Sequence, residues 1–375
     1  MAGIYIHIPF CIHKCSYCNF FSVTSLKNKS EFLKALIKEI GIQKDYLNGE
    51  TINTIYFGGG TPSLLSTDEL HFIFDEIAKF HTISRNAEIT LEANPDDLSS
   101  GKLKELKTLP INRLSIGIQS FHQDDLNYLG RTHDAKQALK CIKEVQVSGF
   151  ENLTIDLIYG IPTLTNEKWK ENLKITFELG VQHLSAYSLT VEPKTPLDVF
   201  IKKGKLENMD DGKSNEHYMI LMEQMKSNAF IQYEISNFCK FGYESKHNSN
   251  YWKMKKYLGL GPSAHSYNLE SRQWNVASIA RYIDLIEKNE PHFEIEELSI
   301  EQKYNEYIMT SLRTIKGCDL ELISKIFGEQ FKAHFEKEAE PFLLNSQLLR
   351  ENNKLFLSDK GKLFADGISG SLFSA

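Results

Sequence analysis

The fold of this chain is constrained most by an alternation of six β-rich runs with helical stretches over its first half. The runs span residues 4–8, 54–57, 88–93, 113–118, 153–158 and 183–189. Apolar residues recur at helical spacing over 30–46, and Ser66 with Glu69 forms a capping box that opens the next helix. Strands that alternate with helices indicate βαβ units and a parallel sheet. Six such units predict an α/β fold, a partial TIM-type (β/α)6 barrel, although the pattern alone also fits a doubly wound sheet.

Polar residues gather where the predicted strands end, and their positions favour the barrel over the doubly wound sheet. Glu92 and Asn94 close the third run, Gln119 follows the fourth, and Asp156 lies within the fifth. In TIM-type barrels the active site lies at the carboxyl ends of the strands. A buried carboxylate is costly unless a donor or a cation faces it. Glu92 and Asp156 therefore predict a ligand that carries ammonium, sulfonium or hydroxyl groups.

Three cysteines, Cys11, Cys15 and Cys18, follow the first run with the spacing C-x3-C-x2-C. Soft thiolate sulfur suits iron–sulfur ligation. Three thiolates on one short loop hold three irons of a cubane [4Fe–4S] cluster and leave the fourth iron open to an exchangeable ligand. The alternative is a structural zinc knuckle with His7 or His13 as the fourth ligand.

A glycine-rich turn with the sequence GGGTP, residues 58–62, follows the second run. Glycines let the backbone approach a ligand closely and leave its N–H and C=O groups free to contact that ligand. A tight strand–helix turn is the alternative for this segment taken alone. Because the turn and the cysteine loop end neighbouring strands of the predicted barrel, we expect both to belong to one site.

The composition excludes several other classes of protein. A net charge of −6 argues against nucleic acid as the main partner, because phosphate binding needs a basic face. Six cysteines in 375 residues do not make a disulfide framework. Neither a secretory signal nor a transmembrane segment is apparent, so we expect a cytoplasmic protein whose thiols stay reduced.

Six motifs of the chain resemble, in order and in approximate spacing, those of the coproporphyrinogen-oxidase branch of the radical S-adenosylmethionine (SAM) superfamily. They are YIHIPFC-x3-C-x-YC, FGGGTPS, LEANP, SIGIQSF, LGRTH and IDLIYGIP. The resemblance implies a [4Fe–4S] cluster on the three cysteines, with SAM on its open iron beside Tyr5, Gly59 and Glu92. In the oxidase a second SAM lies alongside, although the number of SAM molecules here is left open. The residues of the oxidase that contact this second SAM correspond here to Tyr17, Gly60, Thr61, Gln119, Arg131, Asp156 and Thr190.

Two departures separate this chain from the oxidase itself. Phe20 stands where the oxidase has a further cysteine, and His265 stands where the oxidase has an apolar residue. Residues 247–252 read HNSNYW and fit H-N-x-x-Y-W, a pattern similar to that of HemW-type heme chaperones, which bind heme and pass it to an acceptor. We therefore expect a heme chaperone. The alternative is an oxygen-independent coproporphyrinogen III oxidase, which uses a radical derived from SAM to decarboxylate propionates, and whether SAM is cleaved here is left open.

A heme carrier needs an axial ligand, apolar walls and cations that face the propionates. His247 and His265 are the first candidates for axial ligand, and a hydrogen-bonded structural role is the alternative for each. Residues 233–267 also supply the other groups that a heme site needs. Candidate sulfur ligands are Cys239 and Met254, candidate ring walls are Tyr251, Trp252 and Tyr257, and candidate cations are Lys253, Lys255 and Lys256. The expected partners are heme, a heme-accepting protein of unknown identity and a low-potential electron donor, and a dimer is left open.

The strand–helix alternation stops near residue 299. Three helices are predicted over 302–314, 320–327 and 331–344, followed by a hairpin around 352–353 and a final helix. Helices followed by a two-stranded wing are typical of winged-helix-like modules, and we interpret this one as a lid or a partner surface. The predicted organisation is a barrel over 1–230, a connecting segment with the H-N-x-x-Y-W motif over 231–298, and a C-terminal domain over 299–375.

Overall fold

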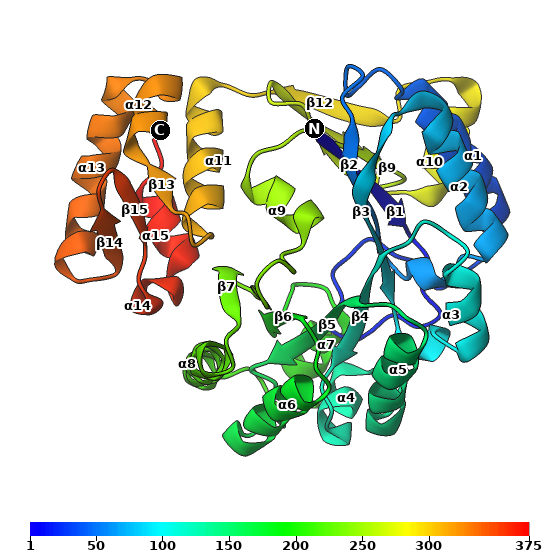
Figure 1. The fold of residues 1–375 in the computed structure, drawn as a ribbon, viewed down its shortest axis with the longest axis horizontal. Helices are drawn as coiled ribbons and strands as arrows, with labels where there is room; N and C mark the ends of the chain where they lie inside the picture. Colours follow the sequence, from blue (N-terminus) through cyan, green and yellow to red (C-terminus); the bar gives the residue numbers. More distant parts are fainter. Residues whose placement is uncertain (375) are drawn as a thin grey trace.

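Six parallel strands lie side by side in the order in which they follow one another along the chain (Figure 1). The computed structural model describes residues 1–374. A doubly wound sheet reverses its strand order at a switch point, whereas these six strands run in sequence, so the sheet has the predicted partial-barrel order. The strands, each at the predicted place, are β1 (Ala2–Ile8), β2 (Ile52–Gly59), β3 (Ile83–Ala93), β4 (Arg113–Gln119), β5 (Asn152–Tyr159) and β6 (His183–Ser188).

Helices connect these strands and follow one side of the sheet in Figure 1. The capping box predicted for the second helix is present, because the Ser66 hydroxyl accepts from the Glu69 N–H and the Glu69 carboxylate accepts from the Ser66 N–H. The first helix is shorter than predicted and ends at Ile42. The connecting helices are α1 (Lys29–Ile42), η1 (Pro62–Leu64), α2 (Thr67–Phe80), η2 (Pro95–Asp97), α3 (Ser100–Leu106), α4 (Gln123–Leu129), α5 (Ala135–Val147) and α6 (Asn166–Glu178).

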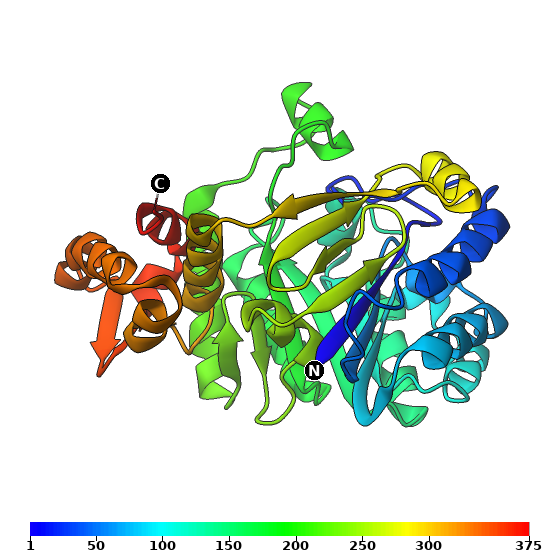
Figure 2. The same ribbon diagram turned by 90° about the horizontal axis from the view of Figure 1, so that it is seen from above.

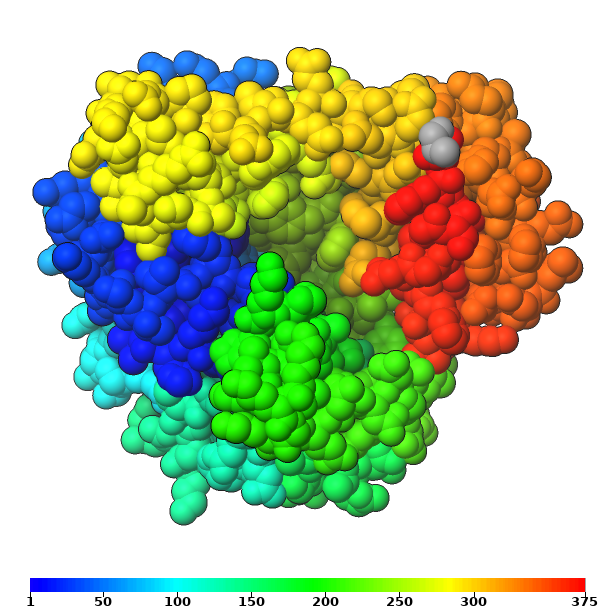
Figure 3. Space-filling view, turned by 180° about the vertical axis from the view of Figure 1, so that it is seen from behind, coloured from blue at the N-terminus to red at the C-terminus, as the bar shows by residue number. Residues whose placement is uncertain are grey.

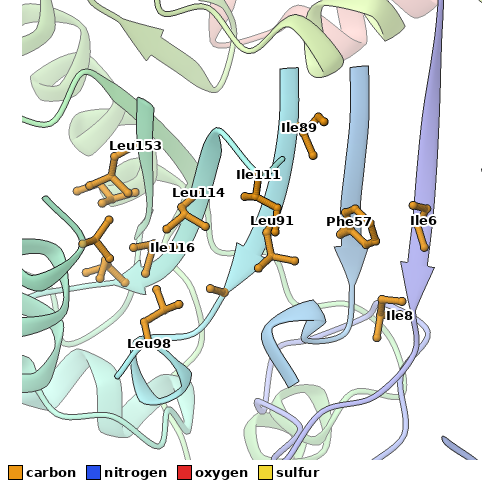
Figure 4. Close-up of a cluster of buried hydrophobic side chains, with 14 of the residues drawn as sticks. Ile6, Ile8, Phe57, Ile89, Leu91, Leu98, Ile111, Leu114, Ile116 and Leu153 are labelled. Carbon is orange, nitrogen blue, oxygen red and sulfur yellow. The ribbon is translucent and has the colours of Figure 1, made fainter. Parts of the chain in front are cut away.

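The two faces of the parallel sheet differ in polarity. On β4, Leu114, Ile116 and Ile118 are fully buried in the main hydrophobic core, and they alternate with Arg113 and Ser115 on the opposite face. Figure 4 shows the apolar side chains that neighbouring strands contribute to this core. The interior of an ordinary TIM barrel is packed with branched apolar side chains. Here the apolar residues face the helices instead, and the polar face lines a cavity.

Residues 231–298, expected as a connecting segment, add strands at both ends of the parallel sheet. One pair of strands extends the sheet beyond β6, and four strands extend it beyond β1. Only one of these strands, β9, is parallel to its inner neighbour β1. The elements are β7 (Ile231–Glu234), β8 (Asn237–Cys239), α9 (Lys246–Trp252), β9 (Tyr257–Leu260), β10 (His265–Tyr267), β11 (Ser271–Asn275), α10 (Ile279–Lys288) and β12 (Phe293–Glu297), preceded by α7 (Pro196–Lys202) and α8 (Asp211–Ser227).

The C-terminal region has a hydrophobic core of its own and lies beside the main body, away from α1 and α10 (Figure 2). Its helices and its hairpin confirm the predicted helical region, and Asn352 has the positive φ that a tight hairpin turn requires. No helix within residues 1–374 combines the length and the apolar composition that a membrane span requires. The elements are α11 (Ile300–Leu312), β13 (Cys318–Asp319), α12 (Leu320–Phe327), α13 (Glu329–Leu344), β14 (Leu348–Glu351), β15 (Lys354–Leu357), α14 (Asp359–Lys362) and α15 (Ala365–Ser371).

Candidate functional site

A cavity of about 390 Å³ lies at the carboxyl ends of the parallel strands. Figure 3 shows a hollow on this molecule between the blue N-terminal part, the green segment near residue 200 and the red C-terminal part. The structure brings most of the predicted site residues together around the cavity. They are Cys11, Cys15, Tyr17, Cys18, Gly59, Gly60, Thr61, Glu92, Gln119, Arg131, Asp156 and Thr190. Tyr5, His247 and His265 do not line the cavity.

The cysteine loop leaves the end of β1 and is closed at its base by backbone hydrogen bonds. The Cys11 N–H donates to the Val23 carbonyl (3.0 Å), and the Val23 N–H donates to the Pro9 carbonyl (2.8 Å). Within the loop, the Cys18 N–H donates to the Cys15 carbonyl (3.2 Å) and forms a tight turn. These bonds hold all three cysteines against the same cavity.

Two of the three sulfur atoms accept hydrogen bonds from cavity side chains. Thr61 Oγ1 donates to Cys11 Sγ (3.4 Å), and Arg131 Nη1 donates to Cys15 Sγ (3.3 Å). Burial raises the pKa of the Cys18 thiol. Donors that face sulfur stabilise thiolates and tune the clusters that the thiolates bind. The donor set therefore fits an iron–sulfur cluster.

A single metal ion fits this geometry less well than a cluster. Across residues 1–374, no group of three His, Cys, Asp or Glu side chains surrounds a point where one ion would bind. In a cubane each thiolate binds a different iron, so the three sulfurs need not converge. His7, a candidate for the zinc alternative, is buried, and its ring nitrogens contact the Tyr5 hydroxyl (3.1 Å) and the Phe21 carbonyl (2.8 Å). The other candidate, His13, is exposed at the edge of the cavity.

The glycine turn packs directly on the chain that leads into the cysteine loop. Gly59 has φ +105°, and a Cβ atom there would lie 2.7 Å from the His7 ring. A Cβ atom at Gly60 would lie 2.6 Å from the Phe10 carbonyl oxygen. The Thr61 N–H donates to the same carbonyl (2.7 Å). The glycines are therefore needed for close packing between β1 and β2 as well as for lining the cavity.

Two partly buried carboxyl groups lie on the polar face of the sheet and line the cavity. The Tyr56 hydroxyl donates to Glu92 Oε1 (2.7 Å), and Ser115 Oγ lies 3.4 Å from Asp156 Oδ1. Burial raises the pKa of Glu92 to about 7 and the pKa of Asp156 to about 6. Because few side chains donate to Glu92 and Asp156, acceptor positions on both carboxyl groups remain for a ligand. The pair therefore fits the ammonium and hydroxyl groups predicted from the sequence.

Arg131 connects the cysteine loop to β3 and β4. Its Nη2 atom donates to Asn94 Oδ1 (2.7 Å) and to the Gly117 carbonyl (2.8 Å), while Nη1 contacts Cys15. Gln119, at the end of β4, has φ +68°, and its amide nitrogen lies 2.8 Å from where a Cβ atom of Gly117 would be. A positive φ strains the backbone of a residue other than glycine, and such strained residues cluster at binding sites.

His247 lies inside the protein and is not exposed to solvent in this conformation. Its Nδ1 atom contacts Thr54 Oγ1 (2.8 Å), its Nε2 atom contacts the Tyr251 hydroxyl (2.8 Å), and its ring stacks on Tyr56 at a centroid distance of 5.0 Å. Burial lowers the pKa of His247 to about 3. The Tyr5 ring, 6.4 Å from the His247 ring, belongs to the same aromatic cluster. Both ring nitrogens of His247 are thus engaged within the protein.

His265 is exposed and begins strand β10, where it pairs with Trp274 across the ladder. The two rings lie 6.3 Å apart. Of the sulfur candidates, Cys239 is fully buried, and burial raises the pKa of its thiol to about 12, which disfavours a thiolate ligand. Met254 packs partly against the C-terminal core. His265 is therefore the more accessible of the two predicted histidine ligands.

Four of the other candidates near the H-N-x-x-Y-W motif make structural contacts. The Tyr251 and Tyr257 rings meet edge to face at 4.7 Å, and Arg313 lies over the Trp252 ring at 5.3 Å. Lys256 forms an ion pair with Glu50 (2.8 Å). The other two lysines of the stretch, Lys253 and Lys255, are exposed.

Sequence reasoning did not predict several residues that line the cavity, namely Tyr56, Arg113, Ser115, Ser185 and Tyr187. A signal for them is present in the alternation of the strands. Residues two apart in a strand point to the same face. Arg113 and Ser115 alternate with buried Leu114 and Ile116, and Ser185 and Tyr187 alternate with buried Leu184 and Ala186.

Comparisons with known proteins agree with this architecture. Residues 5–175 match the Radical SAM superfamily, and residues 298–364 match the HemN C-terminal domain. The heme chaperone HemW of Bacillus subtilis (strain 168) is 36% identical over 375 residues, with 99% of each chain covered. HemW of Mycobacterium tuberculosis (strain ATCC 25618 / H37Rv) is 30% identical, covering 99% of this chain and 94% of its own. The structure of coproporphyrinogen III oxidase (HemN) from Escherichia coli shares the fold with a TM-score of 0.85, at 20% identity, over 100% of this chain and 90% of that one.

Proposed function

Since the chain belongs to the HemW heme-chaperone family of the radical SAM superfamily, we propose that it binds a [4Fe–4S] cluster, SAM and heme and transfers heme to an acceptor protein. The observation that carries the proposal is the common cavity that three cysteines line together with two partly buried carboxyl groups, Glu92 and Asp156, that have few side-chain donors. A heme-accepting protein and a low-potential electron donor are its protein partners, and the cytoplasm, where thiols stay reduced, is its proposed location.

Each group of cavity residues has a role in this proposal. Cys11, Cys15 and Cys18 hold the cluster, and Glu92 and Asp156 accept from the amino group and the hydroxyls of SAM. The Arg131 guanidinium fixes the cysteine loop through Cys15. A bound cluster and SAM together supply one-electron chemistry, while the protein orients them and excludes water.

We place heme next to β10 and β11, with His265 as the axial ligand in this conformation. Exposure of the His265 ring beside Trp274 supports this role. His247 takes the role only if Thr54 and Tyr251 release its two ring nitrogens. The exposed side chains of Lys253 and Lys255 are the proposed partners of the propionates.

The cluster is tested by anaerobic reconstitution with iron and sulfide. We expect a brown protein with four irons per chain, and we expect Cys11→Ala, Cys15→Ala and Cys18→Ala each to lose the visible absorbance. Cys141→Ala is the matched control, because Cys141 is buried among apolar residues of α5. A colourless protein that retains zinc would overturn the proposal.

Heme binding is tested by titration and by the Soret band. His265→Ala is expected to weaken the band and to lower the affinity for heme about tenfold or more. His247→Ala is the comparison, and a larger loss from this variant would move the axial ligand to His247 and require α9 to rearrange.

The chaperone and oxidase functions are separated by one assay of the reconstituted protein. Incubation with coproporphyrinogen III, SAM and a reductant is expected to leave the substrate unchanged, while heme-loaded protein transfers heme to apoprotein acceptors. Formation of protoporphyrinogen would establish the oxidase and reject the chaperone function.

A further inference from the structure

Arg113 opens strand β4 and projects from the polar face of the sheet into the floor of the cavity. Its side chain lines that cavity, although only 1% of the residue is exposed. Arg113 Nη2 donates a hydrogen bond to Thr154 Oγ1 on the next strand. The Nε atom finds no acceptor among residues 1–374. The hydrogen bond to Thr154 therefore leaves most of the donors of this buried guanidinium available to other groups at the cavity floor.

The register of the sheet places Arg113 one layer below Glu92 and two layers below Asp156, because Arg113 pairs with Asn152 on β5. Arg113 pairs with Thr90 on β3, and Glu92 lies two residues further along that strand on the same face. Thr154, which holds the guanidinium, precedes Asp156 by two residues on β5. The positive charge of Arg113 therefore lies beneath Glu92, and its hydrogen bond to Thr154 brings the guanidinium to the layer beneath Asp156.

The charge of Arg113 opposes the effect of burial on the two carboxylates. Burial raises the pKa of Glu92 and of Asp156, and the field of Arg113 lowers both. Burial and this same field lower the pKa of His183 and of His247, so these imidazoles stay neutral. The remaining titratable groups that face the carboxylates are Tyr5, Tyr56, Tyr187, Tyr251 and Arg131.

We propose that Arg113 is a positioning residue for SAM, which acts by favouring the ionised forms of Glu92 and Asp156 so that they accept from the cationic and hydroxyl groups of SAM. The proposal rests on the proposed binding of SAM. It adds a residue that acts on SAM through the charges of Glu92 and Asp156. A guanidinium suits this position because it keeps its charge throughout the working pH range.

The test measures SAM affinity by calorimetry between pH 6 and pH 9 in cluster-loaded protein. We expect Arg113→Gln to bind SAM about tenfold or more weakly than wild type at pH 7, and to recover most of this loss at pH 9, where the carboxylates ionise unaided. Arg113→Lys keeps a charge and is expected to lose less. Because SAM itself titrates, the quantity compared is the ratio of the variant Kd to the wild-type Kd at each pH.

Thr154→Val is the matched control, because it removes the hydrogen-bond partner of Arg113 but leaves the charge in place. We expect its affinity ratio to be flat across the pH range. A flat ratio for Arg113→Gln, or no loss at pH 7, would overturn the proposal and leave Arg113 with a packing role.

A second measurement separates this inference from the proposed function. Wild type and Arg113→Gln are melted without SAM from pH 5 to pH 9. The variant is expected to lose thermal stability over a range that extends to higher pH, because its carboxylates ionise later. If wild type fails to bind SAM, the proposed function fails, while this pH shift still tests the effect of Arg113 on the carboxylates. Identical pH profiles of stability for the two proteins would reject that effect.

Discussion

Two regions of the molecule each hold a glutamate inside the fold, one fully buried and one at the wall of a cavity, and the two differ in their hydrogen-bond donors. Glu39, on α1, is fully buried and accepts four hydrogen bonds, two on each oxygen. The donors are the Gly261 N–H (2.7 Å), Tyr282 Oη (2.5 Å), Asn275 Nδ2 (2.6 Å) and His292 Nε2 (3.0 Å). Glu92, at the cavity, accepts a side-chain hydrogen bond from Tyr56, and burial raises its pKa to about 7.

The difference separates a structural carboxyl group from a ligand-binding one. A carboxylate offers about four acceptor positions, and all four of Glu39 are used by the protein itself. They join α1 to β11, α10 and the segments around them, at the end of the sheet beyond β1. The open acceptor positions of Glu92 face a cavity instead. Buried position alone therefore does not mark a functional carboxylate, whereas an incomplete set of donors does.

The largest expected effect comes from removing the structural carboxyl group. Glu39→Ala leaves four buried donors without an acceptor and should lower the free energy of unfolding by about 3–5 kcal/mol. Denaturant unfolding measures this loss, and Lys34→Ala, at an exposed position of the same helix, is the control. A loss below about 1 kcal/mol would show that the four hydrogen bonds do not hold this region together.

An opposite result is expected for the carboxylate at the cavity. The raised pKa of Glu92 means that the folded state holds a proton more tightly than the unfolded state, so the free energy of unfolding falls as pH rises from about 4.5 to 7. Over this window the loss is on the order of 3 kcal/mol, and Asp156 adds a loss over a lower window. Glu92→Gln removes the part of this pH-dependent loss that Glu92 causes. Without SAM, the variant should therefore be more stable than wild type at pH 8.

Denaturant unfolding of both proteins at pH 5 and pH 8, with and without SAM, checks this expectation. SAM should stabilise cluster-loaded wild type and should leave Glu92→Gln nearly unchanged. Equal stability of the two proteins at pH 8 would contradict the physical argument, and stabilisation of the variant by SAM would remove Glu92 from the binding site.

The smallest effects are expected from a matched pair of tyrosines, one on each carboxyl group. Tyr282→Phe removes one of the donors to Glu39 and should cost about 1.5–3 kcal/mol of unfolding free energy. Tyr56→Phe removes a donor to Glu92 and should cost about 1 kcal/mol, while raising the pKa of Glu92 further. The SAM affinity of Tyr56→Phe should therefore peak at higher pH than that of wild type, whereas Tyr282→Phe should keep the wild-type pH profile. A larger loss of stability from Tyr56→Phe than from Tyr282→Phe would contradict the distinction between the structural Glu39 and the ligand-binding Glu92.

The sequence predicted the parallel strands and most of the cavity because both signals are local. Alternation within a strand and alternation of strands with helices are visible over short windows, and the carboxyl ends of parallel strands share one edge. Strands β7–β12 were not predicted, because each has only three to five residues and is too short to show a clear alternation. Most of them also lie toward the ends of the sheet. Glu39 was not predicted either, because its donors come from residues 261–292, far along the chain.

The two candidate heme ligands, His247 and His265, show what a sequence motif does not predict. The H-N-x-x-Y-W motif can be read from the sequence, but the sequence does not state whether its histidine faces solvent. Tertiary packing places His247 between Thr54 and Tyr251, whereas His265 stays exposed on β10. Burial therefore distinguishes two histidines that the sequence left equivalent.

The sequence by itself determined the order of strands and helices, the cysteine loop, the glycine turn and the family to which the chain belongs. Only the tertiary structure decided which carboxyl group is fully hydrogen-bonded by the protein and which faces a cavity. The physical reason is that hydrogen bonds and electric fields depend on distance in space, and residues such as Glu39 and His292, or Arg113 and Glu92, come together only after the sheet has formed.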